Sequence, residues 1–212
     1  GGSAFVVGKI RNYYILSTNA HVTGVYYRDE DAKVQKGRQF DLLTNEAKPK
    51  HIGKATLVLS EKIPEYLFLR NKNPLSKRSV EQRDFAWLII EEENVERTLK
   101  PIEFLPRFLT DGEIATLVSG WNATVSSGYL DYSNFPDILL WKAYVADGDS
   151  GAPFLVKVGN KYYAVAVCCR EGPTGIFPFS DVVDDMLLAI STPRKSTFFD
   201  IFTKNRSSLD VL

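Results

Sequence analysis

The sequence predicts an all-β protein with one helix near its C-terminus, and two observations lead to that prediction. Short apolar or alternating runs rich in Val, Ile, Phe and Tyr recur along the 212 residues, and these residue types suit a pleated, half-buried surface. Gly, Pro, Asn and Asp interrupt the runs at short intervals, with few helical patterns between them. Many short strands of this kind favour β-barrels or β-sandwiches.

Ten segments are expected to form strands, and Gly159-Asn160 is expected to join two of the strongest in a tight hairpin. In chain order the ten are Ser3–Val7, Tyr13–Ser17, Phe40–Thr44, Ala55–Ser60, Phe85–Ile90, Ile114–Gly120, Ile138–Tyr144, Pro153–Val158, Tyr162–Cys169 and Gly175–Phe179.

The expected helix begins after Ser180, because Ser caps helix N-termini well, and ends before Pro193, which cannot continue a helix. Its apolar positions fall on one face: Val182, Val183, Met186, Leu187 and Ile190. The remaining residues, 194–212, form a mainly polar tail.

Charge and hydropathy exclude several classes of function. The chain carries 26 basic and 26 acidic residues, so we expect no nucleic-acid partner and no anionic membrane surface. No apolar run approaches the roughly 20 residues of a spanning helix, so no membrane insertion is expected. The N-terminus lacks a basic segment followed by an apolar stretch, so no signal peptide is expected in these residues.

The two cysteines, Cys168 and Cys169, are adjacent and belong to one expected strand. Neighbouring side chains on a strand point to opposite faces and pair badly, which predicts two reduced thiols rather than a disulfide framework. His21 and His51 are the only histidines, and no Cys/His spacing resembles a zinc set. We therefore expect no metal and no cofactor.

The segment Asp147–Pro153 lies between two apolar strands and holds a serine flanked by glycines in a Gly-Asp-Ser-Gly-Ala-Pro run. Such a turn can present the Ser150 hydroxyl outward, while the N–H groups of Gly148 and Ser150 converge as an oxyanion hole. Glycine is needed at 148 because a residue with a Cβ would be strained there. Alone, the run is equally typical of a surface turn.

Two residues upstream strengthen the catalytic interpretation. His21 ends one expected strand, and histidine is a common general base. Asp84 stands at the mouth of the apolar strand Phe85–Ile90. Separately, each has a structural alternative, a strand-end histidine and a strand-capping aspartate. Together with Ser150 they form the order His, Asp, Ser at strand ends, which a double barrel brings together.

These motifs resemble the trypsin/chymotrypsin-like serine protease family, over roughly residues 2–191. The segments that carry the resemblance are Gly2–Val7 with Ile15–Val22, Asp84–Leu88 and Gly148–Pro153, where Ala152 replaces the family's usual second glycine. The Asn-Ala-His-Val form and the lack of paired cysteines are closer to the bacterial Deg/HtrA-like branch, here without a PDZ domain.

The resemblance implies two six-stranded-type antiparallel β-barrels with the triad in the cleft between them. Residues 1–105 would form the barrel with His21 and Asp84, residues 106–192 the barrel with Ser150 and the helix, and 193–212 a tail. Ser150 would attack the scissile carbonyl, His21 would carry its proton, and Asp84 would orient His21. The strand that usually comes first in the family's N-terminal barrel is missing from these residues, so either an N-terminal segment supplies it or this barrel is incomplete.

The resemblance also implies the substrate contacts. Cys168, Cys169 and Arg170 fall on the strand to which an extended protein or peptide substrate adds by main-chain hydrogen bonds. Tyr144 falls at the floor of the specificity pocket, and Arg170 near its rim. This pattern favours small or apolar side chains over acidic ones. The family is mostly secreted or periplasmic, although the lack of disulfides leaves the cytoplasm open.

Two other functions fit the same residues. The chain is then a catalytically silent protease-like binding module, or an esterase or acyl transferase that uses the same triad. Silent members of the family usually lose a triad residue, whereas all three are present here. Labelling of Ser150 by a serine-reactive probe distinguishes an enzyme from a silent binding module. A screen of peptide substrates then distinguishes a protease from an esterase or acyl transferase.

Overall fold

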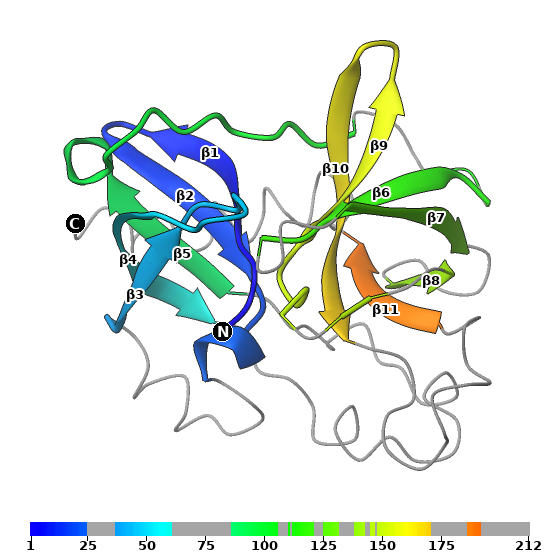
Figure 1. Ribbon diagram of the computed structural model, residues 1–212, viewed down its shortest axis with the longest axis horizontal. Helices are drawn as coiled ribbons and strands as arrows, with labels where there is room; N and C mark the ends of the chain where they lie inside the picture. The colour runs from blue at the N-terminus through cyan, green and yellow to red at the C-terminus, as the bar shows by residue number, and fades with distance from the viewer. Residues whose placement is uncertain are drawn as a thin grey trace.

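The computed structural model describes residues 1–24, 37–60, 86–105, 110, 112–120, 125–131, 138–142, 145–146, 148–170 and 186–191. These residues form two antiparallel β lobes, a five-stranded sheet and a closed barrel (Figure 1). The predicted all-β class with two antiparallel lobes is therefore confirmed. Within the described residues, the first lobe is an open sheet rather than a six-stranded barrel.

The first lobe positions His21 through its two central strands, β2 and β5. In spatial order its strands are β1 (Phe5–Ile10), β2 (Tyr13–Thr18), β5 (Ala86–Glu91), β4 (His51–Ser60) and β3 (Gln39–Leu43). β2 and β5 are buried along almost their whole length, as their continuous apolar runs predict. Thr18 pairs with Ala86, so the last residue of β2 lies beside the first residue of β5 at one end of the sheet.

The second lobe positions Ser150 at the start of a strand of the barrel. Around the barrel its strands are β10 (Lys161–Arg170), β11 (Met186–Ser191), β8 (Ile138–Lys142), β7 (Val125–Asp131), β6 (Ile114–Val118) and β9 (Pro153–Val158). The predicted hairpin at Gly159-Asn160 is confirmed: Val158 pairs with Lys161, and Gly159 has the positive φ of 60° that a tight hairpin turn needs.

Two sequence predictions about the barrel were wrong. Met186–Ser191, assigned to the C-terminal helix, is strand β11, which pairs with β8 and with β10. A short apolar run is compatible with a helix or with a buried strand. Here the strand is favoured, because β11 pairs with the edges of β8 and β10 and so closes the barrel. Val125–Asp131 was not expected to be a strand, because its Ser-Ser-Gly centre is poor in β-formers.

Other predicted elements lie outside the described residues. These are Gly175–Phe179 and the helix cap at Ser180, whereas the remaining nine predicted strands each overlap an observed one. The strands of the first sheet end at Glu91 and those of the barrel begin at Ile114, so the boundary at residue 105 stays a prediction.

Among the described residues, no helix is long and apolar enough to cross a membrane.

A hydrophobic cluster joins the two lobes. Phe5 of β1 packs with Leu155, Ala164 and Val167 of the barrel, and all four are buried. The chain between β5 and β6 runs across both lobes (Figure 1) and makes backbone hydrogen bonds to each. The N–H of Ile102 donates to Val6, and the N–H of Ala164 donates to Glu103, at 2.9 and 2.8 Å. The lobes therefore share one buried interface.

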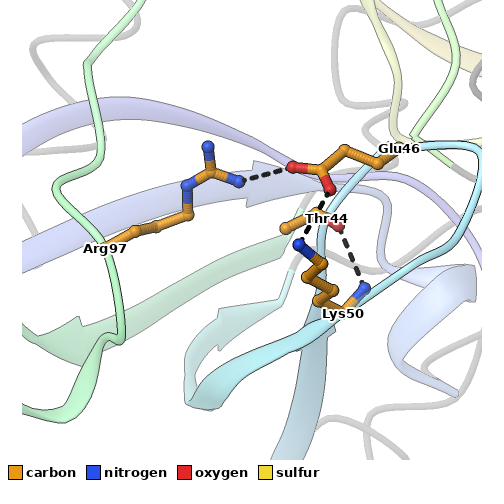
Figure 2. A network of polar contacts seen from close by, with 4 residues as sticks. All are labelled: Thr44, Glu46, Lys50 and Arg97. Carbon is orange, nitrogen blue, oxygen red and sulfur yellow. Dashed lines mark hydrogen bonds and ion pairs between the residues drawn. The ribbon is translucent and has the colours of Figure 1, made fainter.

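A polar network orders the turn between β3 and β4 (Figure 2). Thr44 Oγ1 accepts the backbone N–H of Lys50 at 3.0 Å, and Glu46 pairs with Arg97 at 3.0 Å and with Lys50 at 3.9 Å. Exposed ion pairs of this kind contribute little stability. The strand registers put this turn at the opposite end of the sheet from the edge where Thr18 meets Ala86.

Candidate active site

The turn that carries Ser150 depends on two glycines with positive φ. Gly148 has φ 92° and Gly151 has φ 90°, a region in which a residue with a Cβ is strained. The predicted need for glycine at 148 thus has a local backbone reason. Ser150 itself is half-buried, between the two glycines, immediately before β9.

Backbone hydrogen bonds hold three N–H groups of this turn, those of Asp149, Gly151 and Ala152. The N–H of Asp149 donates to Ala146 at 3.1 Å, and the N–H of Ala152 donates back to Asp149 at 2.8 Å. The N–H of Gly151 donates to the carbonyl oxygen of Cys168 on β10, at 2.8 Å. The turn is therefore fixed both internally and against the barrel wall.

Two amides of the turn are left over by this pattern, and they are the two predicted oxyanion donors. Among the residues that the structure describes, the N–H groups of Gly148 and Ser150 have no hydrogen-bond partner. Both residues are half-buried rather than fully covered. Where two such N–H donors of one turn converge beside a serine hydroxyl, they can stabilise an anion that develops on a bound carbonyl oxygen.

Asp149 is buried beside the nucleophile position, with 3% of its surface exposed. Its Oδ2 accepts the N–H of Ala146 at 2.9 Å, so the side chain and the backbone of Asp149 together close a small ring with Ala146. Its Oδ1 has no hydrogen-bond partner among the described residues. The carboxylate acts as a local clamp that holds the turn in shape.

His21 begins a short 3-10 turn, η1 (His21–Thr23), that follows β2. Ala20 is fully buried, and its carbonyl oxygen accepts both the N–H and the hydroxyl of Thr23, at 3.0 and 2.8 Å. Gly24 ends the turn with φ 86°. The backbone of the His21 turn is thereby held at the end of the buried strand β2.

Gly2 brings the His21 turn and the Ser150 turn together. A Cβ built on Gly2 would lie 2.7 Å from a methyl of Val22 and 2.9 Å from the carbonyl oxygen of Ser150. Residue 22, next to His21, and Ser150 therefore flank one glycine, and the N-terminus lies beside η1 (Figure 1). The contacts of the described residues include no hydrogen bond from Ser150 Oγ to His21. Such bonds are often long in ligand-free enzymes and shorten on binding.

Asp84 and Tyr144 lie outside the described residues. The flanking register is informative for Asp84, because Ala86 pairs with Thr18 where β5 begins. The chain therefore enters β5 at the sheet edge where β2 leaves toward His21.

Of the four residues predicted to contact substrate, Cys168, Cys169 and Arg170 lie on β10. Cys168 is buried in the barrel core, and its backbone N–H and carbonyl bond to Ala152 and Gly151, both at 2.8 Å. It thus anchors the Ser150 turn through its main chain, while its side chain lies in the core. The backbone of Cys169 and Arg170 continues β10, where Arg170 pairs with Leu188 of β11.

Sequence reasoning did not assign a role to Ser3, which contacts the Ser150 turn directly. Its N–H donates to the Ser150 carbonyl oxygen at 2.7 Å, and its hydroxyl to the Gly148 carbonyl oxygen at 2.9 Å. A polar residue after two glycines at the start of an apolar strand was the available signal.

Within the described part of the chain, no group of His, Cys, Asp and Glu side chains could hold a metal ion.

Comparison with known proteins finds matches among solved structures. A scan against protein-family models finds no match, and a search of curated proteins finds none. Among solved structures, the chain is similar to a thermostable serine protease, AL20, from an extremophilic microorganism. The sequence identity is 14% and the TM-score 0.49, over 93% of this chain and 87% of that one.

Proposed function

We propose that this chain is a trypsin-like serine endopeptidase that hydrolyses peptide bonds through His21, Asp84 and Ser150. The observation that carries the proposal is the pair of N–H groups at Gly148 and Ser150, which have no hydrogen-bond partner among the described residues. Every other amide from 149 to 152 is bonded within the protein. These two donors are therefore open to a ligand on the side of the turn that carries Ser150.

In the proposed mechanism, Ser150 Oγ attacks the scissile carbonyl and His21 accepts the hydroxyl proton. The amides of Gly148 and Ser150 donate to the oxyanion of the tetrahedral intermediate. His21 then gives the proton to the leaving amine, and water hydrolyses the acyl-enzyme by the same route. Asp84 holds the His21 ring in the correct tautomer and stabilises the imidazolium. The approach of the two turns on either side of Gly2 supports this assignment.

The peptide substrate is proposed to add as a strand along β10, beyond Cys168. There β10 pairs with β11 on one side. On the other side its pairing with β9 stops at Val167, which lies opposite Pro153, the first residue of β9. An extended peptide can use the remaining main-chain groups of Cys169 and Arg170. Tyr144 and Arg170 are proposed to limit the side chain next to the cleaved bond to small or apolar types.

A fluorophosphonate probe tests the proposal directly, because it reacts with an activated serine. We expect labelling of the wild type and of Ser127→Ala, which removes an exposed serine on β7, but not of Ser150→Ala. Absence of wild-type labelling would favour a silent binding module. Cleavage of a peptide library then supports an endopeptidase, whereas turnover of small esters alone would favour an esterase or acyl transferase.

A further inference from the structure

Ser3 is buried, with 3% of its surface exposed, and joins four segments of the chain. Its N–H donates to the Ser150 carbonyl oxygen at 2.7 Å, and its hydroxyl donates to the Gly148 carbonyl oxygen at 2.9 Å. The same hydroxyl accepts the N–H of Gly120, at 2.9 Å, and the Ser3 carbonyl oxygen accepts the hydroxyl of Thr18, at 2.7 Å. All the hydrogen-bonding groups of Ser3 are thus in use.

These bonds fix the two peptide groups on either side of the Asp149–Ser150 peptide. In the group after Gly148, the carbonyl is held by the Ser3 hydroxyl and the N–H by Ala146. In the group after Ser150, the carbonyl is held by the Ser3 N–H and the N–H of Gly151 by Cys168. Because each held peptide group is planar, the Asp149–Ser150 peptide, which carries the Ser150 N–H, lies between two fixed planes, and the peptide that carries the Gly148 N–H adjoins one of them.

We propose that Ser3 is a positioning residue, which aims the amides of Gly148 and Ser150 at the oxyanion and does not itself touch the substrate. The proposal rests on the proposed function. Ser3 also bonds to Thr18, the last residue of β2 before the His21 turn, so it sets the nucleophile turn against the strand that carries the base. Preorganised donors of this kind need a rigid support to be effective.

The test compares Ser3→Ala with Thr44→Val. Thr44 is the matched control because its hydroxyl is also buried and accepts a backbone N–H, at 3.0 Å, but lies at the far end of the first sheet. Removal of a whole oxyanion donor lowers kcat by about 10²–10³, so loss of the support in Ser3→Ala should lower kcat roughly 10- to 100-fold, with KM nearly unchanged. Affinity for a peptide boronate should fall in parallel, whereas affinity for a product peptide should not.

Ser3→Thr, which keeps the hydroxyl, should recover most of the lost kcat, and Thr44→Val should lower the melting temperature while leaving kcat unchanged. Wild-type kcat and boronate affinity in Ser3→Ala would overturn the proposal. Equal loss of kcat in Ser3→Ala and Thr44→Val would also overturn it, because a general loss of stability would then suffice.

Failure of the proposed function is recognised separately, by a wild type that neither reacts with the fluorophosphonate nor cleaves peptides. In that case, backbone amide NMR signals and hydrogen exchange at Gly148 and Ser150 decide about Ser3. Changes at these two amides in Ser3→Ala, absent in Thr44→Val, would support its positioning role. Unchanged signals would overturn it.

Discussion

The carbonyl oxygen of Ser3 lies against Gly151, well inside the contact distance that a Cβ on that glycine would need. Thr18 Oγ1, which donates to the same carbonyl oxygen, is almost as close. The start of β1, the end of β2 and the turn that carries Ser150 therefore meet at a position where only glycine fits. This contact ties the two lobes together directly at the proposed active site.

Gly151→Ala is expected to destabilise the protein by more than about 4 kcal/mol or to prevent folding, because backbone strain and a steric clash with Ser3 coincide. Gly159→Ala is the matched control. Gly159 also has a positive φ, 60°, but nothing lies within 4 Å of the position that a Cβ would take there, so only the strain of about 1–2 kcal/mol remains. Urea unfolding of both variants measures the difference, and equal losses would contradict the proposed contact.

Phe5→Ala should lower the free energy of unfolding by about 3–5 kcal/mol, because the ring fills the cluster between the sheet and the barrel. The comparison is Phe40→Ala. Phe40 is only partly buried, packs within the first lobe and lies under Arg38, so a smaller loss is expected. Calorimetry should resolve separate transitions of the two lobes in Phe5→Ala but not in Phe40→Ala. A loss below about 1 kcal/mol would mean that the lobes do not depend on this ring.

Asp84→Asn is expected to leave the fold intact and to reduce turnover by roughly 10⁴, because an amide favours the wrong tautomer of His21. A strand-capping aspartate would behave differently, with a loss of about 1 kcal/mol of stability and normal turnover per folded molecule. Thermal melting and burst-titrated kinetics on this variant separate the two roles. Normal turnover with a lower melting temperature would remove Asp84 from the proposed triad.

The ion pair between Lys9 and Glu92 should make a pH-dependent contribution to stability. The hydrogen bond from Lys9, with Nζ 2.5 Å from the carboxylate, holds the pKa of Glu92 below its ordinary value of 4.5 and raises the pKa of Lys9 above 10.5. The stabilisation from the lowered pKa of Glu92 is fully present above pH 4.5 and is lost as the pH falls through the pKa of the folded state. The stabilisation from the raised pKa of Lys9 is fully present below pH 10.5 and is lost as the pH rises through the pKa of the folded state.

Lys9→Met should therefore melt slightly below the wild type from about pH 5 to 10, with the difference shrinking outside that window. The effect should be small, because both side chains are substantially exposed and solvent screens the pair. Glu92→Gln should remove the same pH dependence, and Lys9→Met should add nothing in that background. A difference between the wild type and Lys9→Met that persists unchanged in strong acid would contradict this account.

Much of the fold follows from local patterns. The runs at Tyr13–Thr18 and Ala86–Glu91 are buried central strands because continuous apolar, β-branched residues have few other stable arrangements. Gly159-Asn160 is a tight hairpin turn because only two residues separate the strands and glycine readily adopts the positive φ that such a turn needs. The preference for glycine at 148 was likewise predictable, because it depends on one backbone angle.

The sequence by itself therefore determined the all-β class, most of the strands and the order of the candidate catalytic residues. The tertiary structure alone decided that Met186–Ser191 is a strand, because barrel closure outweighs a helical periodicity. It also decided that Cys168 anchors the Ser150 turn from the core and that Ser3 holds the same turn from the other lobe. The physical reason is that such roles depend on hydrogen bonds between residues far apart in the chain, and a local pattern does not identify the distant partner.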